Sequence, residues 1–513
     1  MDSANRHGHL DESVIPGTVH LVDLEGTIRA KHASGAQLSD VVLVPAPSSD
    51  PDDPLNWSPR RKWLSTASQS MYTLMVGIAS AAIYSVLEPI SEDTGLTLAD
   101  LNAGTGYMFL FFGIGSKILQ GFVGAPIESL CEISITDIYF AHERGTYMGL
   151  YAFMLAGSNF LAPVFAGFIN DGQGWKWVQY WCAIFLAIGF VFCFFFMEET
   201  NYDREPLEMV STPADTSGTV TPKEEKVLST STDPEKTAAI VDPDSNDDHV
   251  AGAVHYTPKS YVQKLALLDK KRDFHLFRMM IRPLLFFSLP SVVYAGFSYG
   301  SNLVWFNVLN GTASLILSAA PYNFSSSMVG LSYVSPLIGV ACGSFYSGVI
   351  GDRVVLWLAR RNKGVLESEH RLWLFSASLV LIPGSLILWG VGAAHHVHWF
   401  GLIFAMGVIA ASNSIGVQLS VSYCIDSYKD LSGEAMVTVI IIRNTMSFAI
   451  GYGVTPWVTN MGYQNAFILA AFAGLAQVLT FLAVVKWGKS WRNMTKKRYY
   501  KFVKESQNLG VTH

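Results

Sequence analysis

The most constraining feature of this chain is a series of apolar stretches, each long enough to cross a membrane as a helix. A membrane-spanning helix needs about 20 mostly apolar residues, because the hydrocarbon core is about 30 Å thick. Nine such stretches are clear, and they cover residues 63–87, 146–169, 177–197, 283–307, 327–350, 372–391, 399–424, 435–459 and 465–486. Half of all residues are hydrophobic and only 15% are charged, whereas about a quarter of the residues of a soluble protein are charged. The sequence therefore predicts an all-α membrane protein that crosses the bilayer many times.

A tenth apolar segment, residues 103–140, is harder to divide into spans. One straight helix of this length would extend about 57 Å at 1.5 Å per residue. Two antiparallel spans do not fit either, because each needs about 20 residues plus a turn. We therefore expect one crossing at residues 118–140, preceded by a tilted, kinked or interfacial half-helix at 103–116. The predicted total is ten spans.

The distribution of Lys and Arg predicts that both termini are cytoplasmic, since cytoplasmic loops carry an excess of these residues. With ten spans and a cytoplasmic N-terminus, the basic groups at 60–62, 353–371 and 486–501, together with Arg144 and Lys429, all fall on the cytoplasmic side, and the opposite loops hold only Lys176. Two glycosylation sequons, at Asn310 and Asn323, fall in a predicted outside loop. This agreement supports counting one crossing within residues 103–140.

Polar segments divide the chain into five parts. Residues 1–62 are predicted to be a disordered cytoplasmic tail, and residues 198–282 a disordered cytoplasmic linker, because both are too poor in large apolar residues to build a core. Residues 63–197 would form an N-terminal bundle of about four spans, and residues 283–487 a C-terminal bundle of six. Residues 488–513 would be a cytoplasmic C-terminal tail. Two bundles joined by a long loop are typical of transporters whose central site opens alternately to either side.

Several other classes of protein are excluded by composition and motifs. The net charge is -6, so a basic surface for nucleic acid is absent. The five cysteines lie inside apolar stretches without a CxxC pair, which excludes a disulfide framework or a zinc module. Histidines 395, 396 and 398 lack a nearby Cys or carboxylate, so we expect no metal site. We also find no motif of a nucleotide-binding site or hydrolase. The chain is predicted to be neither an enzyme nor a cofactor-binding protein.

Four segments resemble the fungal drug:proton antiporter branch of the major facilitator superfamily. They are residues 52–63, 118–146, 170–177 and 197–202, and the likeness extends from about residue 51 to residue 486. The resemblance implies a monomer with two helix bundles in the lipid bilayer that exchanges protons for a small organic molecule, either a drug-like compound or an organic cation. It also implies a plasma-membrane location, with the vacuolar membrane as the alternative. Helix patterns do not decide direction, so proton-coupled uptake of a nutrient or polyamine stays open.

Three motifs of this family have matches in the chain. The helix-four motif Arg-x-x-Gln-Gly is matched from Lys117 to Gly121, with Lys in place of Arg. In the family this cation is linked to proton coupling; alternatively, Lys117 lies at a disturbed junction. The antiporter motif of helix five is matched loosely by small residues and a proline, and the match includes Ala162, Pro163 and Gly167. A cytoplasmic motif that clamps neighbouring helices is matched by Gly348, Asp352 and Arg353.

The usual counterpart of that clamp, between helices two and three of the family, is missing. The chain passes from residues 113–116, which resemble the middle of helix two, directly to Lys117, which resembles the start of helix four. About 40 residues would be lost, corresponding to half a span, a loop and a whole span. Ten helices would then replace the family's twelve. Either an exon was skipped in the gene prediction, or the chain is a membrane protein that transports poorly or not at all.

Ionisable groups at membrane depth are candidates for the functional site. Glu128 and Glu132 are four residues apart, hence on one face of a helix, and Asp137 lies nearer the cytoplasmic end. Two carboxylates in a low dielectric raise the proton affinity of one of them, which suits a group that loads and releases protons. The pair could also attract an organic cation. Alternatively, it neutralises Lys117 or a cation on another helix.

A second group of candidates lies in the C-terminal half. Arg443 is in the middle of a span beside Asn444 and would serve either as the buried partner of a carboxylate or as a contact for an anionic group. Aromatic rings and amides follow one another on an earlier span, and such groups hold flat or cationic organic molecules. These side chains are Tyr294, Tyr299, Asn302, Trp305 and Asn307. The alternative interpretation is that they only pack the helix and anchor it at the membrane interface.

Overall fold

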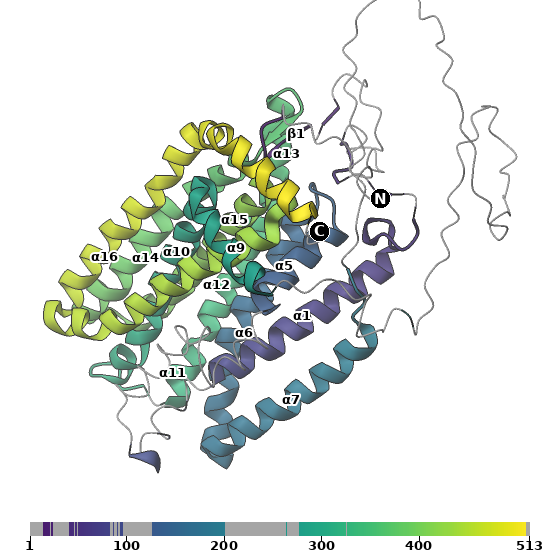
Figure 1. Ribbon diagram of the computed structural model, residues 1–513. Helices are drawn as coiled ribbons and strands as arrows, with labels where there is room; N and C mark the ends of the chain where they lie inside the picture. The colour runs from purple at the N-terminus through teal and green to yellow at the C-terminus, as the bar shows by residue number, and fades with distance from the viewer. Residues whose placement is uncertain are drawn as a thin grey trace, which may run out of the picture.

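The computed structural model describes residues 14–20, 22–23, 41–45, 47–48, 50–82, 86, 90, 93–95, 126–200, 263, 276–324 and 326–508. Over these residues the chain is a bundle of long helices (Figure 1). The only strands among them are β1 (Thr18–His20) and β2 (Val365–Glu367), which form a small antiparallel pair.

The N-terminal bundle contains α1 (Pro59–Ala81), α5 (Pro126–Ile138), α6 (Arg144–Gln173) and α7 (Trp175–Phe196). The Ser58 side chain caps α1 by accepting a hydrogen bond from the Arg61 amide, which satisfies a donor that the helix leaves unpaired. Between α6 and α7 the chain turns at Gly174, whose φ of 85° suits glycine. Helices α1, α6 and α7 pack against one another, and α5 packs against α1 and α6.

The C-terminal bundle is built around α10, α12, α14, α15 and α16, which pack against one another. Helix α16 is two helices that meet at Gly462, where φ is 73°, and a π-helical segment, Tyr346–Ile350, joins α12 to α13. The elements of this half are α9 (Leu276–Leu285), a 3-10 turn (Phe286–Ser288), α10 (Pro290–Ser318), α11 (Ser326–Ser332), α12 (Val334–Phe345), α13 (Gly351–Arg361), a 3-10 helix η5 (Ser368–Ser376), α14 (Ser378–Ala394), α15 (Trp399–Ser427), a 3-10 turn (Lys429–Leu431) and α16 (Ser432–Asn508).

Seven helices of the described part are long and apolar enough to cross a membrane, and the bent pair Ile281–Ser288 and Pro290–Ser318 makes an eighth. These eight coincide with eight of the ten predicted spans. Helices α1 and α5 lie at the other two predicted spans but do not meet the same criterion over their described residues. The all-α class is therefore confirmed, and the total of ten spans stays a prediction.

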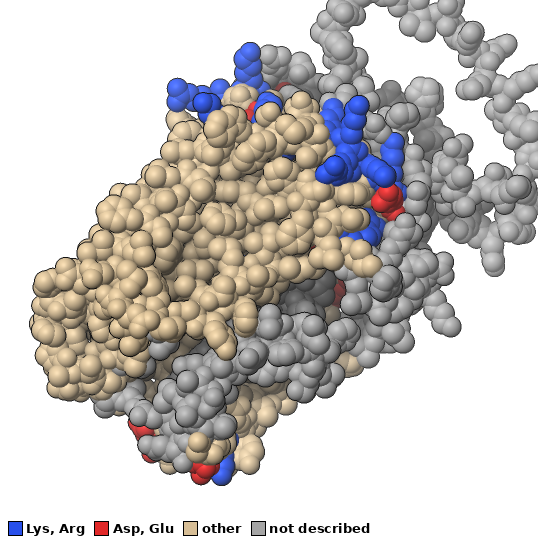
Figure 2. Space-filling view, turned by 60° about the vertical axis from the view of Figure 1, so that its left-hand side comes forward, with Lys and Arg blue, Asp and Glu red and all other residues tan. Residues whose placement is uncertain are grey.

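The outer faces of the helices are apolar. Helix α7 exposes a row of large side chains, among them Phe190, which is 71% exposed. Figure 2 shows a broad belt without described charged residues, with Lys, Arg, Asp and Glu at the ends of the visible face. A soluble monomer rarely exposes so large an apolar patch. The belt is the surface expected of a protein that sits in a bilayer.

The N-terminal segment differs from the disordered tail that the sequence predicts. Thr18 pairs with Glu367, Val19 with Leu366 and His20 with Val365 in the β1–β2 pair. Residues 41–44 lie beside this pair, since Val41 forms a β-bridge with Val22. Valine-rich stretches favour such pairing when an unpaired strand edge is available, and the loop that holds β2 supplies that edge.

Candidate functional site

The two bundles meet along α6 and α12, where glycines allow close approach. A Cβ atom at Gly149 would lie 2.8 Å from the carbonyl oxygen of Ser344, and one at Gly348 would lie 3.1 Å from the carbonyl oxygen of Gly145. Distances this short leave no room for a side chain at Gly149. Small residues therefore bring the backbones of the bundles into contact.

The predicted antiporter motif on α6 is divided between two surfaces. Ala162 is buried in an apolar cluster with residues of α1 and α7, inside the N-terminal bundle. The carbonyl oxygen of Pro163 lies 3.5 Å from the position of a Cβ atom on Gly330 in the other bundle. A Cβ atom at Gly167 would have no neighbouring atom within 4 Å among the described residues. Of these three residues, Pro163 therefore lies closest to the C-terminal bundle.

Next to this contact, four buried ionic side chains connect the bundles. We call Arg144, Asp352, Arg371 and Asp426 the charge cluster. Arg144, at the start of α6, approaches Asp426 of α15 at 3.5 Å (Nη1 to Oδ1), while Arg371 donates to Asp426 at 2.7 Å and to Asp352 at 3.4 Å. Each cation of the cluster lies within 3.5 Å of a carboxylate, so none of the four is buried without a counter-charge.

The start of α6 holds the charge cluster in a second way. The backbone amide of Thr146 donates to Asp352 at 2.8 Å, and its hydroxyl donates to the same oxygen at 3.0 Å. A carboxylate at a helix N-terminus is stabilised by the helix dipole. Close by, Gln418 of α15 donates to the carbonyl oxygen of Gly145 at 2.7 Å. Polar contacts thus connect α6 to α13, η5 and α15 at one end of the molecule.

Of the predicted clamp residues, Asp352 is in this cluster, Gly348 is at the glycine contact and Arg353 is exposed. Sequence reasoning did not identify Asp426, and it used Arg144 and Arg371 only as loop cations that set the topology. All three residues lie at the ends of apolar stretches. At such a position, the sequence does not distinguish an ionic residue that faces the protein interior from one that faces water.

Arg443 lies deep in the C-terminal bundle, together with two other predicted residues. Its Nη1 donates to the Tyr299 hydroxyl at 2.9 Å, and its guanidinium lies 5.0 Å from the centre of the Tyr299 ring. Its Nη2 and Nε donate to Oδ1 of Asn444 at 2.6 and 3.1 Å. The fold therefore brings together Arg443, Asn444 and Tyr299, which the sequence placed on two separate spans.

The acidic and basic candidates of the first half are only partly described. Lys117 lies outside the described residues, and the side chains of Glu128 and Glu132, on α5, are outside them too. Asp137 is half-buried near the end of α5. Helix α5 contacts α16, the helix that carries Arg443. A pairing between Arg443 and one of these carboxylates stays a prediction.

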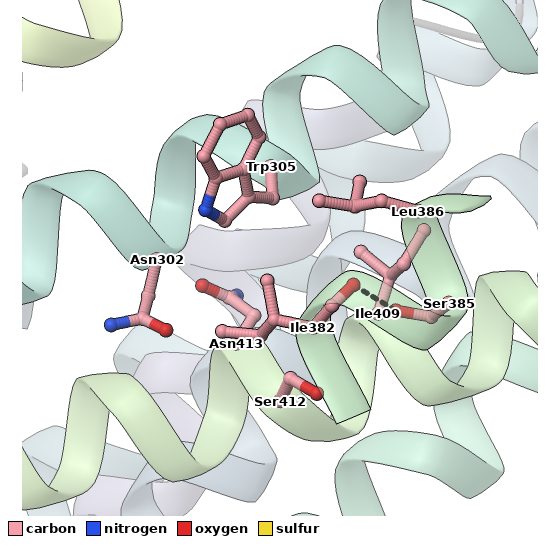
Figure 3. Close-up of a pocket in the computed structure, with 8 residues that line it drawn as sticks. All are labelled: Asn302, Trp305, Ile382, Ser385, Leu386, Ile409, Ser412 and Asn413. Carbon is pink, nitrogen blue, oxygen red and sulfur yellow. Dashed lines mark hydrogen bonds between the residues drawn. The ribbon is translucent and has the colours of Figure 1, made fainter. Parts of the chain in front are cut away.

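A small hollow within the C-terminal bundle contains further predicted residues (Figure 3). Helices α10, α14 and α15 form it. Its lining combines amides, hydroxyls, one indole and aliphatic side chains, namely Asn302, Trp305, Ile382, Ser385, Leu386, Ile409, Ser412 and Asn413. Asn302 and Trp305 were candidates from the sequence. Ser385 and Ser412 were not, because short hydroxyl side chains are common in spanning helices and give no distinctive signal.

The polar atoms that face this hollow are mainly hydrogen-bond acceptors. The hydroxyls of Ser385 and Ser412 donate to backbone carbonyls of their own helices, at 3.0 and 2.9 Å, as the dashed line in Figure 3 marks for Ser385. The Trp305 indole donates away from the hollow, to Gln477 on α16, at 2.7 Å. Asn302 is 1% exposed and Asn413 5%, and neither side-chain oxygen has a hydrogen-bond partner among the described residues. Buried acceptors in proteins nearly always have a hydrogen-bond donor, so a donor group of a ligand would be favourable here.

The remaining candidates lie away from the hollow. The Tyr294 ring packs edge-on against Tyr423, at 5.8 Å between ring centres, and Asn307 is half-buried on α10. Asn310 is not in a loop, as the sequence suggested, because α10 continues to Ser318 and includes it. Its side-chain oxygen is buried. Asn323 is exposed in the segment between α10 and α11. In the described part of the chain, no three His, Cys, Asp or Glu side chains are grouped as metal ligands would be.

Comparison with known proteins agrees with this architecture. The sequence model described as Major Facilitator Superfamily matches residues 71–320. An uncharacterized MFS-type transporter of Schizosaccharomyces pombe is 27% identical, over 98% of this chain and 96% of its own length. Protein HOL1 of Saccharomyces cerevisiae is 25% identical over 98% and 99% of the two chains. The efflux pump vrtL of Penicillium aethiopicum is 23% identical over 86% of each.

Two solved transporter structures also resemble this chain in shape. The proton:xylose symporter XylE matches with a TM-score of 0.48 and 10% identity, over 84% of this chain and 97% of its own. The human organic anion transporter MFSD10 matches with a TM-score of 0.43 and 13% identity, over 82% and 83%. The helical architecture confirms the expected all-α class, and the matches to the sequence model and to the relatives support the major facilitator type.

Proposed function

We propose that this chain, whose membership of the Major Facilitator Superfamily its sequence matches support, is a proton-coupled exporter of small organic cations. The coarser part of this statement, a membrane transporter of small molecules, is supported by relatives that are named as transporters. The observation that carries the proposal is the contact between the bundles: it depends on a compact set of ion pairs and glycines. Such a contact can separate and re-form as the bundles rock.

The hollow supports a cation as substrate. Two buried amide oxygens and two hydroxyl oxygens face it as acceptors, and Trp305 forms part of its wall. An ammonium group supplies several donors and is attracted by an aromatic face. The Asn302 amide nitrogen already donates to the Ser298 carbonyl oxygen at 2.7 Å, so the free oxygen of this side chain favours a donor over an anionic group. The cation that these residues suit is therefore a primary ammonium group, which would enter only when α10, α14 and α15 move apart, because side chains close the hollow in this conformation.

The proposal of export by proton exchange rests on the resemblance to antiporters and on ionisable groups at membrane depth. Arg443 occupies the interior of the C-terminal bundle, next to the Tyr299 hydroxyl. Keeping a guanidinium there is costly, so a role in transport explains its presence better than packing does. The opposite direction, uptake of a nutrient or polyamine, uses the same residues. Only the response to a proton gradient separates the two.

A transport assay in proteoliposomes separates these directions. With the chain reconstituted and a labelled alkylammonium compound outside, an inside-acid gradient should drive accumulation if the protein exchanges protons for substrate. An inside-alkaline gradient should drive it if the protein is a symporter. Accumulation that depends on neither gradient would contradict proton coupling.

A variant of Gly416 tests the place of the substrate. A Cβ atom at Gly416 would lie 2.3 Å from Cγ of Asn302, so Gly416→Ala must displace that amide from the hollow. We expect the KM for the ammonium compound to rise about tenfold, which is a loss of about 1.4 kcal/mol of binding. Gly451→Ala is the matched control, because its Cβ position has no neighbouring atom within 4 Å in the described part of the chain. Equal KM values for the two variants would exclude the hollow as the site.

A second candidate function, a membrane protein that does not transport, is favoured by one observation. The alignment with the Schizosaccharomyces pombe relative spans 561 positions, and this chain has 513 residues. At least 48 positions of that alignment are therefore gaps in this chain, which is comparable to the predicted loss of about one and a half spans. Sequencing the messenger across the codons for residues 116 and 117 tests this. An intact message without extra codons, together with surface-delivered protein that shows no flux, would favour this candidate.

A further inference from the structure

The N-terminal segment touches both bundles at the end where the charge cluster lies. We call residues 14–20, 22–23 and 41–45 the strap. We propose that the strap ties the cytoplasmic ends of the two bundles together and thereby restrains opening of the transporter toward the cytoplasm. The proposal rests on the proposed rocking of the two bundles, but it concerns residues outside the membrane spans.

The strap joins the C-terminal bundle through backbone hydrogen bonds. Strand β1 adds to β2, in the connection between α13 and η5. The Val22 amide donates to the carbonyl oxygen of Gly364 at 3.1 Å, and the Ser368 amide donates to that of Gly17 at 3.2 Å. A Cβ atom at Gly364 would lie 2.0 Å from the Val22 carbonyl oxygen. The strap therefore lies directly against the backbone of this connection.

The last helix of the chain holds the strap from a second direction. Arg492, which is fully buried, donates to the carbonyl oxygen of Pro16 and also pairs with Glu369, with Nε to Oε1 at 2.9 Å. Further along α16, the hydroxyl of Tyr500 donates to the carbonyl oxygen of Val14 at 3.1 Å. A buried guanidinium that satisfies a backbone oxygen of the strap would lose that acceptor if the strap left.

The other part of the strap reaches the N-terminal bundle. The amide of Ala141, in the connection between α5 and α6, donates to the carbonyl oxygen of Val44 at 2.8 Å. Valines of the strap pack between Ala141 on one side and α13 on the other, in an apolar cluster formed by Val22, Val41, Val42, Val44, Ala141, Val355, Ala359 and Leu366. This cluster is a small core shared by the tail, the α5–α6 connection and the C-terminal bundle.

Separation of the bundles at this end would pull Ala141 away from α13 and β2. The strap cannot move with both bundles, so either the Ala141–Val44 hydrogen bond or the contacts with Gly364 and β2 must break. Breaking either one exposes buried valines to water, which is unfavourable in proportion to the apolar area exposed. The strap therefore favours the conformation in which the cytoplasmic ends are closed, in addition to the restraint from the charge cluster.

A pair of matched variants on the strap tests this restraint. Val22 is 2% exposed and lies in the shared cluster, whereas Val14 is 45% exposed and contributes its backbone oxygen. Val22→Asp should detach the strap, and Val14→Asp should not. Spin labels at Arg60 of α1 and Arg361 of α13, both exposed, report the distance between the cytoplasmic ends by pulsed electron resonance. The exposed Cys342 is replaced by Ser in all chains so that it takes no label.

We expect the ratio of closed to open molecules to fall about tenfold in Val22→Asp, which corresponds to about 1.4 kcal/mol, and to stay unchanged in Val14→Asp. Identical distance distributions in the two variants, with the strap of Val22→Asp shown to be detached by faster proteolysis of the tail, would overturn the proposal.

A protease site inserted after Pro47 provides a second route if Val22→Asp does not fold. The intact protein folds first, and cleavage then frees the strap from the rest of the chain. Cleavage should lengthen the label distance; an unchanged distance after complete release of the tail would also refute the restraint. Because the readout is a distance, it stays informative even if the chain carries no substrate, so failure of the strap and failure of the proposed function are distinguishable.

Discussion

Removing Asp426 should weaken the contact between the bundles as well as the C-terminal bundle that contains it. Asp426 faces two cations, Arg371 of its own bundle at 2.7 Å and Arg144 of the other bundle at 3.5 Å. In Asp426→Asn, the carboxylate of Asp352 would be the only negative charge of the cluster. Breaking one partner of a buried ion pair typically costs about 3–5 kcal/mol, because the remaining charge is left buried without compensation.

The part of this loss that acts between the bundles is the coupling of Asp426 to Arg144. Two unit charges 3.5 Å apart attract by about 5 kcal/mol at an effective dielectric constant of 20, and desolvation offsets much of that. We therefore expect a net coupling of about 1–3 kcal/mol, or about a five- to 150-fold shift toward separated bundles. A double-mutant cycle with Arg144→Gln and Asp426→Asn isolates this coupling from the effect of Arg371.

The assay is the distance between spin labels on the two bundles, measured for the four chains of the cycle. A second ion pair supplies the control: Arg282 and Glu434 lie 3.2 Å apart within the C-terminal bundle. Arg282→Gln should lower the unfolding temperature without changing the inter-bundle distance. The reasoning would be refuted if the effects of Arg144→Gln and Asp426→Asn were additive, or if Arg282→Gln opened the bundles equally.

Two further outcomes follow from particular positions. Gly149→Leu should abolish transport, because its Cβ atom would lie 2.8 Å from the Ser344 carbonyl oxygen and would force α6 away from α12. Gly172→Leu, on the same helix, should retain transport, because its Cβ position has no neighbour within 4 Å among the described residues. Equal losses in the two variants would contradict the glycine contact. In a glycosylating host, Asn323→Gln should remove any attached glycan, seen as a shift in electrophoretic mobility, while Asn310→Gln should change nothing because Asn310 lies within α10. A shift caused by Asn310→Gln would contradict its position in that helix.

The resemblance and the spacing of residues found part of the site before the fold was known. Asp352 and Gly348 were identified through a clamp motif, and both lie where the bundles meet. Arg443 and Tyr299 were identified because polar residues are rare inside apolar stretches, and they are in contact. Their contact could not be predicted, since the two positions are 144 residues apart in sequence and helix periodicity says nothing about which helices become neighbours.

By itself the sequence determined that this chain is helical and apolar enough to lie in a membrane, and it predicted two halves. Those properties depend on local composition, because about 20 consecutive apolar residues can span a bilayer as a helix wherever they occur in a chain. The tertiary structure alone decided that Arg144 meets Asp426, that serine hydroxyls and amide oxygens from three helices face one hollow, and that a polar tail supplies a strand to a distant loop. Each of these is a contact between segments whose separate patterns are ordinary, and its energy exists only once packing has removed water from between them.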